Sequence, residues 1–150
     1  MKLFAIIVVV STVLLSACSK DGGAVNPDPT PALTTTLSAT INGTDWVGTN
    51  VVSIAAGGIR QITGGSANLS SGYQISVQMR NIGEGTYNVS TASNWFSVVR
   101  YENGGESTDP QFATSGTVTI TKSTSEVIIG KFEGTAGSYV VTKGAFTIKL

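Results

Sequence analysis

Beyond Leu37 the chain alternates between apolar and polar residues with a period of two. The clearest run covers 73–80, where apolar residues at 73, 75, 77 and 79 are separated by Gln, Ser, Gln and Arg. Successive side chains of a β-strand point to opposite faces, so this run predicts a strand with one buried and one solvent-facing side. Asn42-Gly43 is a strong signal for a hairpin turn. The pattern predicts an all-β domain.

The expected strands are short and evenly spaced along the chain. Glycine-rich breaks at 57–58, 64–65, 83–85 and 104–105 separate several of them. Such strands are typical of a single antiparallel β-sandwich, with an open or closed β-barrel as the alternative. We expect strands at 37–41, 46–54, 59–63, 73–80, 86–90, 94–102, 115–121, 126–134, 138–142 and 145–150.

Two of these strands are apolar on both faces. In 95–101, Trp95 and Tyr101 share one side while Phe96 and Val98 share the other, and 127–132 shows the same property. A strand of this kind either lies inside a packed structure or presents one apolar face to a ligand. For 95–101 both alternatives stay open.

The beginning of the chain has a different composition. Lys2 precedes an apolar run over 3–15, and two small residues then precede Cys18, the single cysteine. This is the layout of a secretory signal peptide, and the run is shorter than the about 20 apolar residues of a transmembrane helix. The Leu-Ser-Ala-Cys ending resembles the lipobox of bacterial lipoproteins. The resemblance implies cleavage before Cys18 and attachment of lipid, with acyl chains such as palmitate, to its sulfur.

The residues after Cys18 bear on the destination of such a lipoprotein. Ser19 stands where an aspartate would favour retention at the inner membrane, so the resemblance implies the outer membrane. The stretch 19–23, with the single acid Asp21, resembles the acidic tag that sends Bacteroidetes lipoproteins to the cell surface. The cell surface and the periplasmic face both stay open.

A linker follows the cysteine. Three of the four prolines lie at 27, 29 and 31, and three threonines follow at 34–36. Proline-rich segments of this kind favour extended, poorly packed conformations. We therefore divide the chain into a signal peptide at 1–17, a lipidated cysteine with its flexible linker at 18–36, and a β-domain at 37–150.

Four segments of the β-domain carry a resemblance to a known group. They are 39–46 (Ala-Thr-Ile-Asn-Gly-Thr-Asp-Trp), Gly85-Thr86-Tyr87, 128–134 and 141–146. Together they resemble an uncharacterised family of small all-β Bacteroidetes lipoproteins, in which a strand, a short turn and an aromatic residue open the domain. The resemblance implies an all-β lipoprotein. The family has no established activity, so no functional residue is transferred from it.

The composition excludes several kinds of chemistry. The chain contains no histidine, and Cys18 is assigned to the lipid, so Ser-His-Asp and Cys-His catalysis and zinc, haem and iron–sulfur sites are excluded. The formal net charge is zero, which provides no basic field for nucleic acid. We expect no cofactor beyond the lipid and no enzymatic activity, with a hydrolase that uses only carboxylates left open.

An acidic, glycine-rich stretch at 102–109 offers oxygen ligands for a hard cation. Glu102, Glu106 and Asp109 are the candidates for Ca²⁺. Their spacing does not match an EF-hand, and acidic loops of this kind are more commonly free of metal.

Aromatic residues supply the candidate ligand site. A ring of Trp or Tyr can stack against the apolar C–H face of a pyranose, and Trp95 and Tyr101 are the candidates for this role. Asn94 and Arg100 are the neighbours that would hydrogen-bond sugar hydroxyls. The alternative is that these rings fill the core, as we expect of Trp46 beneath the first hairpin.

Two functions of different classes follow. The first is a non-catalytic binding or accessory module, anchored by lipid at the outer membrane, for a glycan or a peptide. The alternative is a structural envelope protein that acts through protein–protein contacts, for example by adding a free edge strand at 145–150 to the sheet of a partner.

Overall fold

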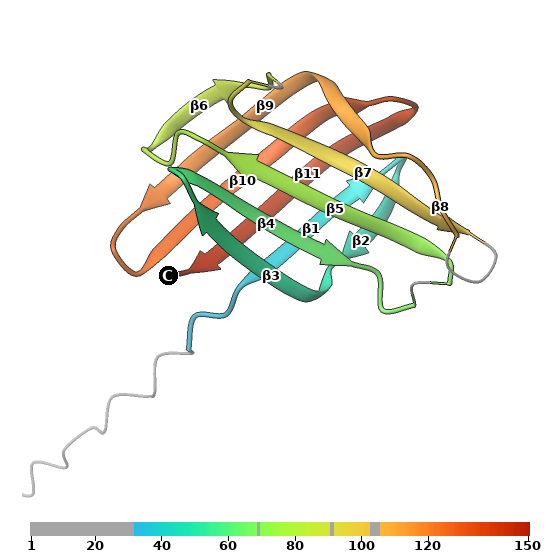
Figure 1. The fold of residues 1–150 in the computed structure, drawn as a ribbon, viewed down its shortest axis with the longest axis horizontal. Coiled ribbons are helices and arrows are strands. Elements are labelled where there is room, and N and C mark those ends of the chain that lie inside the picture. Colours follow the sequence, from blue (N-terminus) through green and yellow to red (C-terminus); the bar gives the residue numbers. More distant parts are fainter. Residues whose placement is uncertain (1–31, 69, 91, 103–105) are drawn as a thin grey trace, which may run out of the picture. The chain divides into compact units, whose positions relative to one another are not determined.

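A single antiparallel sheet makes up the domain (Figure 1). The computed structural model describes residues 32–150 apart from 69, 91 and 103–105. Within these residues the sheet has the order β2-β1-β11-β10-β9-β7-β5-β4-β3, with β6 beside β9 and β8 beside β7. The strands are β1 (Thr36–Ile41), β2 (Thr44–Val47), β3 (Thr49–Ala56), β4 (Ile59–Gly65), β5 (Gly72–Met79), β6 (Gly85–Asn88), β7 (Trp95–Glu102), β8 (Glu106–Ser107), β9 (Gln111–Ser123), β10 (Val127–Ala136) and β11 (Tyr139–Lys149). No helix long and apolar enough to cross a membrane occurs in this part of the chain.

The long strand β9 makes the sheet curl. Its first two residues, Gln111 and Phe112, pair with β7, whereas the stretch from Ala113 onward pairs with β10 and in part with β6. β9 therefore belongs to both layers of the curled sheet. In the view of Figure 1 the strands of one layer cross those of the other. The predicted all-β antiparallel class is confirmed, and the curled sheet is nearly a barrel, one of the two forms that the sequence left open.

Gly48 forms the corner at which the chain passes from one end of the sheet to the other. It is the single residue between β2 and β3, and its N–H donates to the carbonyl oxygen of Leu37 at 2.8 Å. A Cβ at this position would lie 3.0 Å from both that oxygen and the Trp46 ring. The predicted strand 46–54 is therefore two strands in different layers.

Trp46 is buried, as predicted, and its indole N–H donates to Ser66 Oγ at 3.0 Å.

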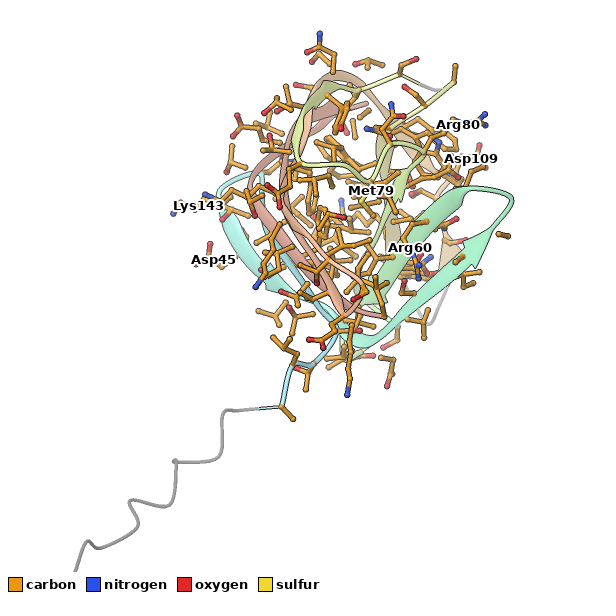
Figure 2. All side chains as sticks on the ribbon, turned by 90° about the vertical axis from the view of Figure 1, so that its left-hand side faces the viewer. Asp45, Arg60, Met79, Arg80, Asp109 and Lys143 are labelled. Atoms are coloured by element: carbon orange, nitrogen blue, oxygen red, sulfur yellow. The ribbon has the colours of Figure 1, made fainter. Side chains whose placement is uncertain are left out.

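Three phenylalanines join the two layers across the core. The ring of Phe132 on β10 lies 5.4 Å from that of Phe96 on β7 and 6.4 Å from that of Phe146 on β11, between centroids. All three side chains are buried. Figure 2 shows Met79 among these interior side chains, while labelled charged residues such as Asp45 and Lys143 lie at the periphery. The inner face of the sheet is thus packed against itself.

The C-terminal strand corrects the sequence analysis. The predicted strands 138–142 and 145–150 are one strand, β11, with an irregularity at Lys143, whose φ is 51°, and Gly144. β11 pairs with β10 on one side and with β1 on the other. The expectation of a free edge at 145–150 is therefore wrong. β9 also starts at Gln111, earlier than expected, and β8 was not anticipated.

Close contact between β9 and β10 requires glycine at two facing positions. Gly116 and Gly134 are paired, with φ of 124° and 148°. A Cβ on Gly134 would lie 2.0 Å from the carbonyl oxygen of Ser115. We expect Gly134→Ala to lower the free energy of unfolding by roughly 2–5 kcal/mol, because it combines backbone strain with overpacking. Urea denaturation measures the change.

The matched control for this substitution is Gly43→Ala. Gly43 also has a positive φ, 83°, but nothing lies within 4 Å of a Cβ there. Only the backbone strain then remains, and the loss should be about 1–2 kcal/mol. Equal losses at the two positions would show that the close approach of β9 and β10 does not constrain the sheet.

Candidate functional site

Strand β7 places the four predicted ligand-binding residues in three different surroundings. Trp95 and Tyr101 share the face of β7 that points away from the core, because Phe96 and Val98 between them are fully buried. Arg100 lies on the same face as these buried residues, beyond the end of the core. Asn94 immediately precedes the strand. The four residues therefore do not converge on one ligand.

Asn94 has a structural role in the loop before β7. Its side chain is 0% exposed. Its Oδ1 accepts hydrogen bonds from the backbone N–H of Arg80 at 2.8 Å and of Asn81 at 3.2 Å, and its own carbonyl accepts one from Ser90 N–H at 2.7 Å. These hydrogen bonds hold the segment after β5 against the start of β7. They also occupy Asn94 Oδ1, the atom that would accept a hydrogen bond from a sugar hydroxyl.

The side of the sheet that faces away from the core carries no charge within the paired segments of β3, β4, β5 and β7. We call twelve of the side chains that the register places on it the outer face. They are aliphatic, aromatic, amide or hydroxyl groups. The outer face comprises Val52, Ile54, Gln61, Thr63, Gln74, Ser76, Gln78, Trp95, Ser97, Val99, Tyr101 and Phe112.

Aromatic rings lie at two places on the outer face. Trp95 packs edge-to-face against Phe112, with 5.2 Å between centroids and 79° between planes. Tyr101 lies opposite Gly72, which has no side chain to cover it, and its hydroxyl donates to Gln74 Oε1 at 2.7 Å. Trp95 and Tyr101 are both half-buried. They are six positions apart on one strand, which corresponds to about 20 Å.

Neutral hydrogen-bonding groups fill the space between these rings. Gln61 and Gln78 lie directly opposite each other on β4 and β5. The hydroxyls of Thr63 and Ser76 are 2.9 Å apart, and Gln61 Nε2 donates to Thr63 Oγ1 at 3.3 Å. A shallow hollow of about 170 Å³ adjoins them, lined in part by Val52, Thr63 and Gln74. Amides and hydroxyls can both donate and accept, so this region suits a ligand rich in hydroxyl groups.

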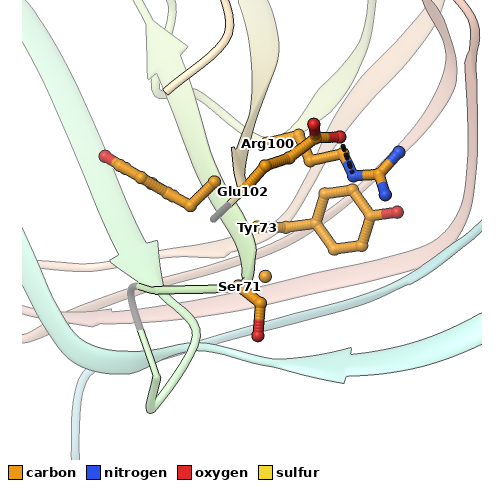
Figure 3. A pocket seen from close by; sticks show the side chains of 6 residues that line it. Ser71, Tyr73, Arg100 and Glu102 are labelled. Atoms are coloured by element: carbon orange, nitrogen blue, oxygen red, sulfur yellow. Dashed lines mark ion pairs between the residues drawn. The ribbon is translucent and has the colours of Figure 1, made fainter. Parts of the chain in front are cut away.

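A second hollow, of about 440 Å³, lies where β5 begins and β7 ends (Figure 3). Tyr73, Arg100, Tyr101 and Glu102 line it, together with Ser71 and Gly72. Arg100 Nε lies 2.9 Å from Glu102 Oε1, and both side chains are about half exposed. A solvated ion pair of this kind contributes only about 0–1 kcal/mol to stability. Arg100 is thereby paired, and it faces away from Trp95.

The predicted calcium ligands are only partly within the described chain. Residues 103–105 and the side chain of Glu106 lie outside it, Glu102 pairs with Arg100, and Asp109 is exposed. Among the described side chains, no three His, Cys, Asp or Glu residues are grouped as metal ligands would be. Cys18, the predicted lipidation site, also lies outside the described residues.

Comparison with models of protein families, with curated proteins and with solved structures gives no match for this chain. The resemblance to Bacteroidetes lipoproteins therefore stays a prediction.

The sequence analysis missed part of the outer face. It identified Trp95 and Tyr101 but not Phe112 or the three glutamines. The alternation in 73–80 does indicate that Gln74 and Gln78 point away from the core. The sequence holds no comparable signal that β4 and β7 flank this strand, so the shared face emerges only from the strand order.

The role of Asn94 can be tested separately from ligand binding. We expect Asn94→Ala to lower the free energy of unfolding by about 1–3 kcal/mol, because two backbone N–H groups lose their buried acceptor. Thermal or urea denaturation measures this loss. Asn88→Ala, at an exposed position of β6, serves as the control. A loss no greater than that of the control would contradict the structural role.

Proposed function

We propose that the chain is a non-catalytic module, anchored by lipid at the bacterial outer membrane, that binds a neutral glycan through its outer face. The observation that carries the proposal is the absence of charge from this face, combined with half-buried Trp95 and Tyr101 on one strand. Binding of a neutral sugar then requires no desolvation of an ion, which is costly for buried charges.

The chemistry of a sugar fits the arrangement of these groups. The C–H face of a pyranose is apolar and can pack on an aromatic ring, while its hydroxyls need partners that donate and accept. The outer face offers the rings at 95, 101 and 112 and, between them, the amides of Gln61, Gln74 and Gln78. The distance of about 20 Å between Trp95 and Tyr101 favours a chain of several sugar units over a monosaccharide.

Substitution of the rings tests the proposal. In affinity gel electrophoresis, a soluble β-glucan, xylan or mannan should retard the domain, whereas the polyanion alginate should not. Trp95→Ala and Tyr101→Ala should each weaken binding at least about five-fold, because aromatic anchors commonly contribute more than about 1 kcal/mol to binding.

Val140→Ala is the control for the loss of an exposed apolar side chain elsewhere, since Val140 is 53% exposed on β11. It should bind like the unmodified chain. Retardation by none of the neutral polysaccharides, or by alginate alone, would contradict the proposal. Unchanged binding of both aromatic variants would show that the ligand lies elsewhere.

The proposed membrane anchor has its own test. We expect mass spectrometry of the protein from bacterial membranes to find the N-terminus at Cys18, with acyl chains attached, and Cys18→Ala to release the protein from the membrane fraction. Several acyl chains give a stable anchor, whereas one chain binds only marginally. A cysteine without lipid would contradict the anchor. Protease treatment of intact cells then distinguishes the cell surface from the periplasmic face.

The alternative function is that of a structural envelope protein that acts through protein–protein contacts. The free edge assigned to 145–150 does not support it, since β11 is paired on both sides.

A further inference from the structure

Residues 52–56 of strand β3 form an edge of the sheet without the usual protection. β3 pairs with β4, and no other described strand is paired with it. The opposite end of the sheet is β2, which is only four residues long and carries Asp45. β3 has eight residues without a charge or a proline, and after the register irregularity between Thr49 and Val52 it pairs regularly as far as Ala56. Natural edge strands are normally kept short, or interrupted by charge or proline, to avoid pairing with another chain.

The hairpin between β3 and β4 determines which backbone groups point to the open edge. Its two turn residues, Gly57 and Gly58, have φ of 57° and 77°, and Ala56 lies opposite Ile59. The residues that flank such a turn share a hydrogen bond, and hydrogen-bonded pairs alternate along an antiparallel ladder. The N–H and C=O groups of Ser53 and Ala55 are therefore the ones directed away from β4.

The side chains on either side of Ser53 suit pairing of β3 with the same strand of a second copy. Val52 and Ile54 are 55% and 63% exposed on the outer face. In an antiparallel pairing with a two-fold axis at Ser53, Val52 of each copy faces Ile54 of the other. Ser53 then faces Ser53 of the second copy, with the backbone groups of both directed at each other. Cross-strand pairs of β-branched residues stabilise a sheet.

An unpartnered polar atom marks the same position. Ser53 Oγ is buried, yet it has no hydrogen-bond partner among the described residues. Buried hydroxyls are normally paired. The two-fold pairing brings two Ser53 hydroxyls to the same side of the joined sheets at directly opposed positions, where each hydroxyl can serve as donor or acceptor to the other.

We propose that β3 pairs with β3 of a second copy of this chain, antiparallel and centred on Ser53. The pairing joins two sheets into one and makes their outer faces continuous. It does not depend on what the outer face binds. An interface formed by one short strand from each copy is small, so the dimer is weak and its formation depends on concentration.

Sedimentation equilibrium tests this pairing. All buried apolar side chains that the structure describes lie between Leu37 and Ile148, so residues 19–150 retain every one of them. We expect reversible dimerisation at concentrations up to the order of 100 µM. Val52→Lys/Ile54→Lys sets lysine against lysine at both cross-strand contacts and should raise the dissociation constant at least about ten-fold.

Two further variants make the test specific for the register. Val52→Glu/Ile54→Lys sets opposite charges against each other at the same contacts, and should associate at least about ten-fold more tightly than the double-lysine variant. Ser125→Lys/Val140→Lys adds the same charge at exposed positions of other elements and should dimerise like the unmodified chain. A chain that stays monomeric up to the highest concentration overturns the proposal. Equal association of the two charged β3 variants overturns the register.

Discussion

The packing of one sheet against itself is the constraint on which the rest of this structure depends. The described residues contain no helix that could cover the inner face, so β7 must come to lie over β10 and β11. The contact between Phe96 and Phe132 closes the two layers. It requires a long β9 that serves both layers and glycines where strands approach too closely for a side chain, as at Gly116 and Gly134. Without this curl the inner face would remain exposed to water.

The same constraint leaves the other side of the sheet free for function. The inward positions in the middle of the central strands are used for packing, as Ile75, Val77 and Phe96 show by their complete burial. The alternate positions on β5 and β7 point away from the core and hold amides, hydroxyls and aromatic rings. A rigid sheet presents these groups at fixed separations, which favours recognition because little conformational entropy is lost on binding.

The sequence predicts the local structure of this chain better than its arrangement. Alternation in 73–80 and the Asn42-Gly43 turn correctly indicate strands and a hairpin, since both depend on neighbours in the chain. The corner at Gly48 and the continuation of β11 through Lys143 were missed, because strand pairing and tertiary contacts decide them. The candidate site shows the same difference between features set by neighbours in the chain and features set by tertiary contacts. Trp95 and Tyr101 are identifiable as aromatic residues on one face, whereas the burial of Asn94 depends on backbone groups 13 and 14 positions away.

An NMR titration of the labelled domain with a neutral oligosaccharide tests the proposed glycan site without any substitution, because the signals that shift locate the bound ligand. The two tryptophans provide an internal comparison, since Trp46 is buried in the core and Trp95 lies on the outer face. We expect shifts of the Trp95 indole N–H and of the amide signals of β4, β5 and β7, with the Trp46 indole N–H unchanged. Shifts confined to the hollow beside Arg100 and Glu102, or no shifts with any neutral oligosaccharide, would contradict the proposed site.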